Sequence, residues 1–287
     1  MYFSRIRLRP EILKSSQLHR VLEGNVYGAH RLLWDLFAEQ KRSYIYREEI
    51  AREQLGSVSN VRGESIYYMV SKTRPIEPEH SLFKVETKDY HPQLMSGQVL
   101  SFECRVNPVI TKSGKKHDVV MDAQLVFLKR LIEEFKLENE LPAKPEKKSY
   151  KKLLLNQGGE VIKQKLIEIL AADRRYVEHL QQVSTTAALL EWAIKAQIDS
   201  ALENWWQRQG ERCGFNLVFN DSGFSKLQNS AYQWHALPEK GKKAGFNSVD
   251  FTGELQITDV EKFTSTLFNG LGRSKAFGCG LLMIRRV

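Results

Sequence analysis

The opening segment of the chain alternates between two sets of side chains, and this alternation predicts a first strand over residues 2–8. Residues 26–40 instead place apolar side chains at helical spacing, which predicts a helix. Shorter strand-like runs follow at 43–46, 65–70 and 82–85. Turn-forming residues between 90 and 97 then predict the end of a first domain, which we place at residues 1–95.

The second predicted domain, residues 96–287, opens with a clear alternation. Apolar side chains take every second position from residue 100 to 106, and Pro108 ends the strand. Helical spacing then predicts a helix at 122–137 and two longer helices at 160–182 and 186–209. The segment 138–152 contains two prolines and several lysines, and we expect it to be a flexible, solvated loop.

Strand patterns return in the last third of the chain, at 215–219 and 249–257. Thr258 and Glu261 have the spacing of a capping box, which predicts the start of a helix that ends at Asn269-Gly270. Residues 281–284 then predict a final strand.

The order strand, helix, strands, helix, strand is thus predicted twice, and it is typical of ferredoxin-like domains. We therefore expect an α+β fold with two tandem ferredoxin-like (RRM-like) domains, the second carrying a helical insertion at about 123–203. An open sheet of this topology can bind RNA, although a fold alone does not establish a function.

Composition narrows the classes of partner. The chain has 43 Lys and Arg against 34 Asp and Glu, a formal net charge of +9, which favours an anionic partner such as nucleic acid, an acidic protein or a membrane surface. An apolar fraction of 42% excludes a wholly disordered chain, and no apolar run is long enough to span a membrane.

Cys104, Cys213 and Cys279 are too far apart for a disulfide framework or a Cys-x-x-Cys zinc site. The opening residues lack a signal-peptide pattern, so we expect a cytoplasmic protein.

A first candidate site lies in the helix predicted at 26–40. Tyr27, His30 and Arg31 are three or four residues apart and would cluster near the start of that helix. Together they could supply an acid, a base and a positive charge to an RNA phosphodiester, since histidine titrates near neutral pH. The alternative is that His30 is a structural residue beside the apolar stripe.

The glycine-rich segment 270–280 is a second candidate. Its four glycines would let backbone amides approach a phosphate, and Arg273 and Lys275 add charge. The order helix, loop, strand excludes a Walker loop and a dinucleotide fingerprint. The alternative is a tight helix-to-strand loop whose glycines have positive φ.

Two lysine clusters complete the candidates. Lys240, Lys242 and Lys243 lie at an expected hairpin tip, where they could bind phosphates in an RNA groove. Lys112, Lys115 and Lys116 come just after the strand that carries Arg105, and they could bind phosphates in the same way. For both lysine clusters, the alternative is a solvated turn. The pair Trp205-Trp206 is expected in the core or at an interface rather than stacked on bases.

With these segments identified, the sequence resembles the CasE family, the CRISPR repeat endoribonucleases of type I-E Cascade. The likeness rests on the opening Met1-Tyr2-Phe3-Ser4-Arg5, on Tyr27-x-x-His30 with the following Leu33-Trp34-Asp35-Leu36-Phe37, on Arg105-Val106-Asn107-Pro108 and on the glycine-rich ending 270–282. The ending is the most specific of the four, and all occur in the family's order.

The resemblance implies metal-independent cleavage of precursor CRISPR RNA at the base of a repeat hairpin. The 2′-hydroxyl would attack, giving a 2′,3′-cyclic phosphate and a 5′-hydroxyl, and the product would stay bound as part of Cascade with its other subunits. No metal, cofactor or membrane is expected. Carried over by residue, His30 transfers protons, Tyr27 assists it, Lys275 and the loop amides hold the RNA backbone, and the lysines of the hairpin tip enter the RNA groove. Together with the candidates described above, the residues expected to contact RNA are Arg31, Arg105, Lys112, Lys240, Lys242, Lys243, Gly272, Arg273, Ser274 and Lys275.

An alternative function is a non-catalytic subunit that binds an RNA hairpin through the same basic surfaces. The resemblance leaves residues 123–203 unexplained, because short family members lack them. Arg273 also stands where some relatives carry proline.

Overall fold

The computed structural model describes residues 1–9, 26–38, 42–50, 65–77, 81–183 and 185–287. By their internal contacts the residues form two compact units. One unit combines residues 1–108 with 206–287, and the other comprises residues 109–205. The larger unit contains both principal sheets, whereas the smaller one is mainly helical.

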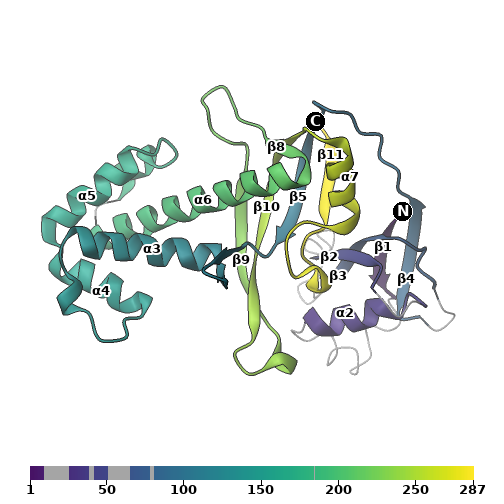
Figure 1. Cartoon of the computed structure of the whole chain (residues 1–287), viewed down its shortest axis with the longest axis horizontal. Helices are drawn as coiled ribbons and strands as arrows, with labels where there is room; N and C mark the ends of the chain where they lie inside the picture. Colours follow the sequence, from purple (N-terminus) through teal and green to yellow (C-terminus); the bar gives the residue numbers. More distant parts are fainter. Residues whose placement is uncertain (10–25, 39–41, 51–64, 78–80, 184) are drawn as a thin grey trace, which may run out of the picture. The chain divides into compact units, whose positions relative to one another are not determined.

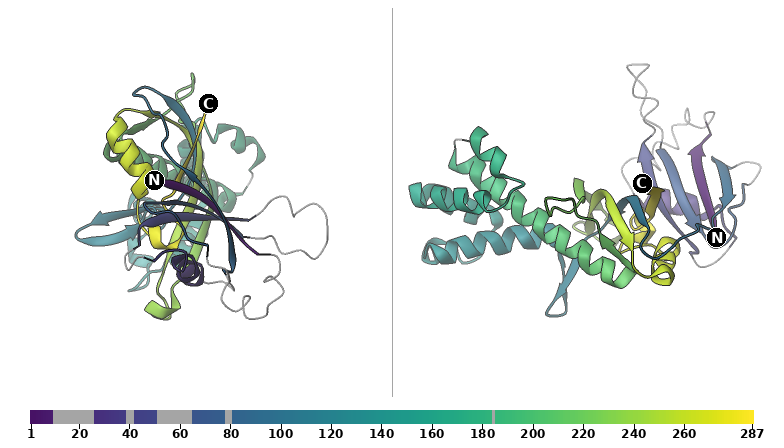
Figure 2. Two further views of the ribbon diagram at one scale, coloured as in Figure 1. Left: turned by 90° about the vertical axis from the view of Figure 1, so that its right-hand side faces the viewer. Right: turned by 90° about the horizontal axis from the view of Figure 1, so that it is seen from above.

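The first sheet is antiparallel and has the order β2-β3-β1-β4. Its strands are β1 (Tyr2–Leu8), β2 (Tyr44–Ile50), β3 (Ser65–Ser71) and β4 (Phe83–Asp89), and the right-hand view of Figure 2 shows them side by side. Helix α2 (Val26–Trp34) packs on this sheet through Ala29 and Leu33. The alternation in β1 is explained by this packing, because Ile6 and Leu8 are buried beneath that helix.

Helix α2 is shorter than the predicted 26–40. The amides of Leu36 and Phe37 bond to carbonyls three residues back, Leu33 and Trp34, which tightens the last turn and ends the helix. Between β3 and β4 the described residues form no helix, so the second helix of the ferredoxin-like pattern is not seen in that connection.

The second sheet has the order β11-β5-β10-β8. Its strands are β5 (Val99–Val106), β8 (Phe215–Leu217), β10 (Gly245–Ile257) and β11 (Leu282–Arg286), and β9 (Gln228–Ala236) pairs with β10 as a long hairpin (Figure 1). In both sheets the first and third strands along the chain are neighbours, which is the ferredoxin-like order. The predicted fold class, two tandem ferredoxin-like domains, is confirmed.

Helix α7 (Val260–Asn269) connects β10 to the glycine-rich segment. Its N-cap is Asp259, whose carboxylate accepts from the Lys262 amide at 3.0 Å, so the prediction of a Thr258 capping box is wrong by one residue. The predicted stop is confirmed, because Gly270 caps the helix with φ +76°.

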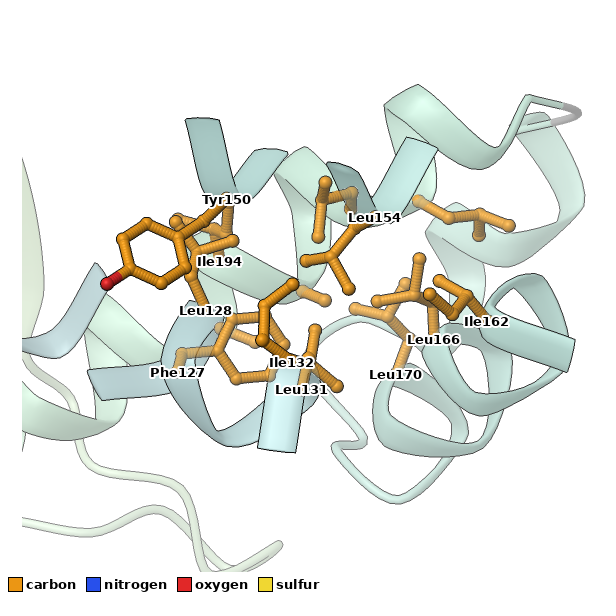
Figure 3. Packing of buried hydrophobic residues seen from close by; sticks show 14 of the residues in the cluster. Phe127, Leu128, Leu131, Ile132, Tyr150, Leu154, Ile162, Leu166, Leu170 and Ile194 are labelled. Carbon is orange, nitrogen blue, oxygen red and sulfur yellow. The ribbon is translucent and has the colours of Figure 1, made fainter. Parts of the chain in front are cut away.

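The smaller unit begins with the hairpin β6 (Val109–Lys112) and β7 (Lys115–Asp118), followed by helices α3 (Val119–Glu134), α4 (Lys147–Gln157) and α5 (Gly159–Ala171) and the first part of α6 (Thr186–Cys213). Short 3-10 turns η2 (Glu138–Glu140) and η3 (Val177–Gln182) connect them. Leucine, isoleucine and aromatic side chains from these helices form a core of their own (Figure 3).

Two predictions for this region are wrong. The segment 138–152 is not a loop throughout, because α4 begins at Lys147 and buries Tyr150 and Leu154, four residues apart on one face. The helix predicted at 160–182 ends at Ala171, and the Asp173 carboxylate accepts from the amide of Arg175, a local bond that competes with helix formation.

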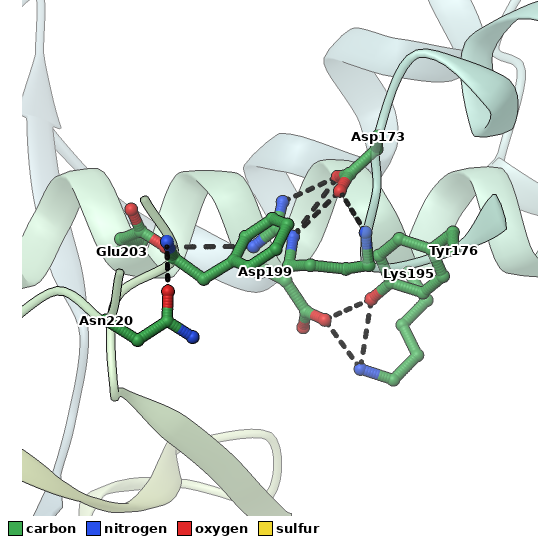
Figure 4. A network of polar contacts seen from close by, with 8 residues as sticks. Asp173, Tyr176, Lys195, Asp199, Glu203 and Asn220 are labelled. Carbon is green, nitrogen blue, oxygen red and sulfur yellow. Dashed lines mark hydrogen bonds and ion pairs between the residues drawn. The ribbon is translucent and has the colours of Figure 1, made fainter. Parts of the chain in front are cut away.

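Helix α6 is fastened to the chain after α5 by polar contacts. The Tyr176 hydroxyl donates to the Asp199 carboxylate, and Lys195 Nζ lies 2.7 Å from the same carboxylate (Figure 4). Farther along α6, Trp205 and Trp206 are both buried, as predicted, and Trp206 packs against Phe102 and Phe251 in the second sheet. None of the described helices has the length and apolar character needed to cross a membrane.

Candidate active site

His30 lies on α2 with its ring half-buried among aromatic side chains. The ring centroid is 5.4 Å from that of Trp34 and 6.0 Å from that of Phe277, both in edge-on geometry. Its backbone carbonyl accepts a hydrogen bond from the Tyr44 hydroxyl at 3.2 Å, which ties α2 to β2. His30 is therefore held between the first sheet and the glycine-rich segment.

The surroundings of His30 favour its neutral form. Burial lowers the pKa of the imidazole below its usual value, and the positive charge of Arg42 lowers that pKa further. At neutral pH the ring is consequently able to accept a proton, as general-base catalysis requires.

The two neighbours predicted to assist His30 are less defined. Tyr27 lies in α2 one turn earlier, but its side chain is outside the described part of the structure. Arg31 is on the same helix with an exposed side chain. The roles of both remain predictions.

The glycine-rich segment forms a tight turn, here called the glycine turn (residues 270–280), between α7 and β11. Gly270, Gly272, Gly278 and Gly280 all have positive φ between 73° and 89°. At Gly280 a Cβ would lie 2.5 Å from the Leu271 carbonyl oxygen, so only glycine fits. The interpretation as a tight helix-to-strand loop is confirmed, and phosphate binding by the same residues stays a prediction.

Polar contacts fix the glycine turn to both sheets. Asn107 Nδ2 donates to Ser274 Oγ at 2.8 Å and forms a β-bridge with Arg273 through the backbone. From the first sheet, the Tyr46 hydroxyl donates to the carbonyl of Ala276 at 3.3 Å. The 3-10 turn η5 (Lys275–Phe277) therefore lies against β2 and α2 with its Lys275 half-buried.

The tip of the β9–β10 hairpin approaches the same place. Lys240 ends the 3-10 turn η4 (Pro238–Lys240), and its ammonium lies 5.7 Å from the Phe277 ring centroid. Phe246, at the start of β10, stacks on Phe277 at 5.8 Å. Lys242 and Lys243 are exposed at the tip. Three segments far apart in the sequence, α2, the hairpin tip and the glycine turn, thus meet around Phe277.

Two predicted RNA contacts have other partners in the structure. The Arg105 guanidinium forms a two-pronged ion pair with Asp250 at 2.7 and 2.8 Å and donates to the Glu48 carbonyl at 3.2 Å. Lys112, which belongs to the smaller unit, pairs with Asp122 at 2.5 Å. Both residues have a structural role here, and their contact with RNA stays a prediction.

A model of the family described as "CRISPR associated protein" matches residues 1–286. The chain belongs to this family. The expected relationship to the CasE endoribonucleases is confirmed.

A curated relative of the chain is the CRISPR-associated endoribonuclease Cse3 of Thermus thermophilus, 31% identical over 85 residues. The match spans 28% of this chain and 40% of that relative, less than half of each.

Solved structures match over the full length. Cse3 of Thermus thermophilus, bound to an RNA that represents a pre-cleavage complex, superposes with a TM-score of 0.59 at 19% identity over 99% of this chain and 98% of that one. Cas6e of Escherichia coli K-12 superposes with a TM-score of 0.50 at 17% identity over 100% of both chains. These similarities establish a shared fold.

The structure also shows a residue near the site that sequence reasoning missed. Arg42 lies two residues before Tyr44, and its charge acts on both His30 and Lys275. The available signal was the alternation of Arg42, Tyr44 and Tyr46 from just before β2 into that strand, which places all three toward one face. Within the described ranges, no three His, Cys, Asp or Glu side chains form a group that could hold a metal ion.

Proposed function

We propose that the chain is an endoribonuclease that cleaves precursor CRISPR RNA at the base of a repeat hairpin, without a metal ion, and keeps the product as a subunit of Cascade. One observation carries this proposal: His30, the glycine turn and the lysine-bearing hairpin tip converge around Phe277. The relative named as a CRISPR-associated endoribonuclease and the family assignment support the same reaction class.

In the proposed reaction a ribose 2′-hydroxyl attacks the adjacent phosphorus. A bond forms from the 2′-oxygen to phosphorus, the bond from phosphorus to the 5′-oxygen breaks, and the products are a 2′,3′-cyclic phosphate and a 5′-hydroxyl. The neutral imidazole of His30 takes the 2′-hydroxyl proton, and the leaving 5′-oxygen takes a proton from solvent water. Tyr27, one helical turn earlier, assists this proton transfer.

RNA binding in this proposal uses phosphate contacts. Lys275 and the amides of the glycine turn hold the backbone near the cleaved bond, while Lys240, Lys242 and Lys243 enter the groove of the hairpin. An A-form groove is too deep and narrow for side chains to read its bases, so contacts there are mainly to phosphates. Such binding weakens with added salt.

The experiment compares wild-type protein with His30→Ala on a labelled CRISPR repeat hairpin RNA in the presence of a chelator, resolved on a denaturing gel. We expect wild-type cleavage to persist in chelator and the variant to lose about 10²–10⁴-fold in single-turnover rate. His91→Ala, which changes an exposed histidine, is the matched control and should retain activity.

Three results would contradict the proposal. Undiminished cutting by His30→Ala would remove His30 from the mechanism, and loss of wild-type cutting in chelator would remove metal independence. Salt-sensitive binding of the hairpin without any cleavage would instead support a non-catalytic RNA-binding subunit. With excess RNA, product retention predicts a single turnover per protein molecule.

A further inference from the structure

Arg42 is a half-buried arginine with no counterion among the described residues. Within the same ranges its Nη1 atom is buried and makes no hydrogen bond, and the guanidinium forms no ion pair. A buried donor atom of a cation that lacks an acceptor is costly, so proteins normally pair such groups. This environment calls for an explanation beyond packing.

The position of Arg42 follows from β2. Side chains at every second residue of a strand share a face, so Arg42 continues the face that carries Tyr44 and Tyr46. Tyr44 reaches the His30 carbonyl and Tyr46 reaches the Ala276 carbonyl in the glycine turn. Arg42 therefore begins a run of alternate residues whose next two members contact α2 and the glycine turn.

Cations dominate this surface. Lys275 is half-buried and likewise has no ion pair within the described part of the chain, and Arg42 lowers the pKa of both Lys275 and His30 after the larger effect of burial. Tyr44 and Tyr46 remain neutral, because burial raises the pKa of each phenol well above its usual value. The charge of one cation thus acts on the other cation and on a titratable imidazole, and no described carboxylate forms an ion pair with either cation.

We propose that Arg42 is a phosphate-contacting residue of the cleavage site, which acts with Lys275 to neutralise the scissile phosphate as it gains negative charge. This inference rests on the proposed function. When the 2′-oxygen attacks and His30 removes its proton, the singly charged phosphodiester becomes a doubly charged phosphorane. A guanidinium offers planar paired donors to two phosphate oxygens, and its charge is fixed in place before the reaction starts.

The test uses Arg42→Gln and Arg42→Lys in the full chain, with Arg74→Gln, an exposed arginine of the same unit, as matched control. Under single-turnover conditions we expect Arg42→Gln to lose about 10²–10³-fold in cleavage rate. Arg42→Lys should recover part of the loss, because it restores the charge but not the paired donors. The control should cleave at the wild-type rate.

A melting curve separates this role from a structural one. If Arg42 only supported the fold, Arg42→Gln would melt at a lower temperature. A phosphate-binding arginine is an unpaired cation in the RNA-free protein, so Arg42→Gln should melt at the wild-type temperature or above it. A clearly lowered melting temperature together with wild-type cleavage per folded molecule would overturn the inference.

A third measurement is independent of catalysis. Binding of a repeat hairpin with a 2′-deoxy nucleotide at the cleavage site is measured across salt concentrations for wild type and Arg42→Gln. We expect weaker binding and a slope of log affinity against log salt smaller by about one phosphate contact. If wild-type protein cleaves no RNA, the proposed function fails, while this binding arm still decides on Arg42. Identical affinities and slopes would refute phosphate contact.

Discussion

Two arginines in the larger unit lie in opposite electrostatic settings. Arg105, on β5, is held by the Asp250 carboxylate on β10 and by a carbonyl of β2, so its charge is compensated and its donors are used. Arg42, just before β2, lowers the pKa of both His30 and Lys275 through its positive charge and has no ion pair among the described residues.

The difference separates structural charge from functional charge. A compensated arginine joins strands and has little left to offer a ligand, whereas an uncompensated cluster is ready for an anion at the cost of stability. The residues predicted to contact RNA fall into these two classes. Arg105 is compensated, whereas Lys275 and the exposed Lys242 and Lys243 are uncompensated.

The largest effect on stability is expected at the compensated arginine. Arg105→Ala leaves Asp250 without its partner in a largely buried setting, which should cost about 3 kcal/mol. The expected fall in Tm is roughly 6–10 °C for a protein of this size. The double variant Arg105→Ala/Asp250→Ala should lose less than the sum of the two single variants, because it leaves no unpaired charge. Additive losses would show that the pair is uncoupled.

A smaller loss of stability is expected from a substitution in the glycine turn. This turn is bonded to the strand of Arg105, because the Gly280 amide donates to the Arg105 carbonyl at 2.7 Å. Gly280→Ala combines φ +89° with a Cβ placed 2.5 Å from a carbonyl oxygen, and we expect a cost of about 2 kcal/mol with reduced cleavage. Gly223→Ala, at φ +80° with open space around it, has the backbone strain alone and should cost less. Equal Tm losses would mean that the close approach is irrelevant.

A weaker effect on RNA binding is expected at the hairpin tip. Lys242→Ala and Lys243→Ala remove exposed charges, so each should weaken binding several-fold and reduce the salt slope by about one. Stability should not change. Lys84→Ala, an exposed lysine of β4, serves as the control in the same titration and should bind as wild type does.

The smallest expected effect is a shift in pH dependence. Because His30 must be neutral to accept a proton, cleavage should fall as the pH drops through the imidazole pKa, which burial and Arg42 place below 6.5. In Arg42→Gln the nearby charge is gone, and the acid limb of the residual rate should move upward toward pH 6.5. Lys240, whose ammonium lies over the Phe277 ring that contacts the imidazole, is present in both proteins. An unmoved limb in the pH–rate profile would exclude coupling between Arg42 and His30.

The sequence predicted those strands in which one face is apolar. In β5 the buried residues Leu100, Phe102, Cys104 and Val106 take every second position, and this pattern found the strand. Strand β9 was not predicted because it is largely exposed and pairs mainly through its backbone, so its sequence has no apolar alternation. Helix α4 was not predicted because lysines dominate the composition of its segment, and only Tyr150 and Leu154 are buried.

The candidate site could be predicted in part. His30 and the glycine turn belong to recognisable patterns, and the structure brings them to 6.0 Å between the His30 and Phe277 rings. The alternation of Arg42 with Tyr44 and Tyr46 indicates which face Arg42 shares, but its significance comes from its charge acting on His30 and Lys275, which only folding brings near. In the same way, the pairing of Arg105 with Asp250 depends on strand register, which local composition does not specify.

The chain enters the helical unit and leaves it at neighbouring points. It starts at Val109 and ends at Trp205, and the Trp205 indole Nε1–H donates to the Val109 carbonyl at 3.3 Å, which closes the excursion at its base. An insertion whose two ends already touch can grow, shrink or be replaced over evolutionary time without shifting the pairing of β5 with β10. The helical unit can therefore vary in size while the second sheet, and the glycine turn attached to it, keep their structure.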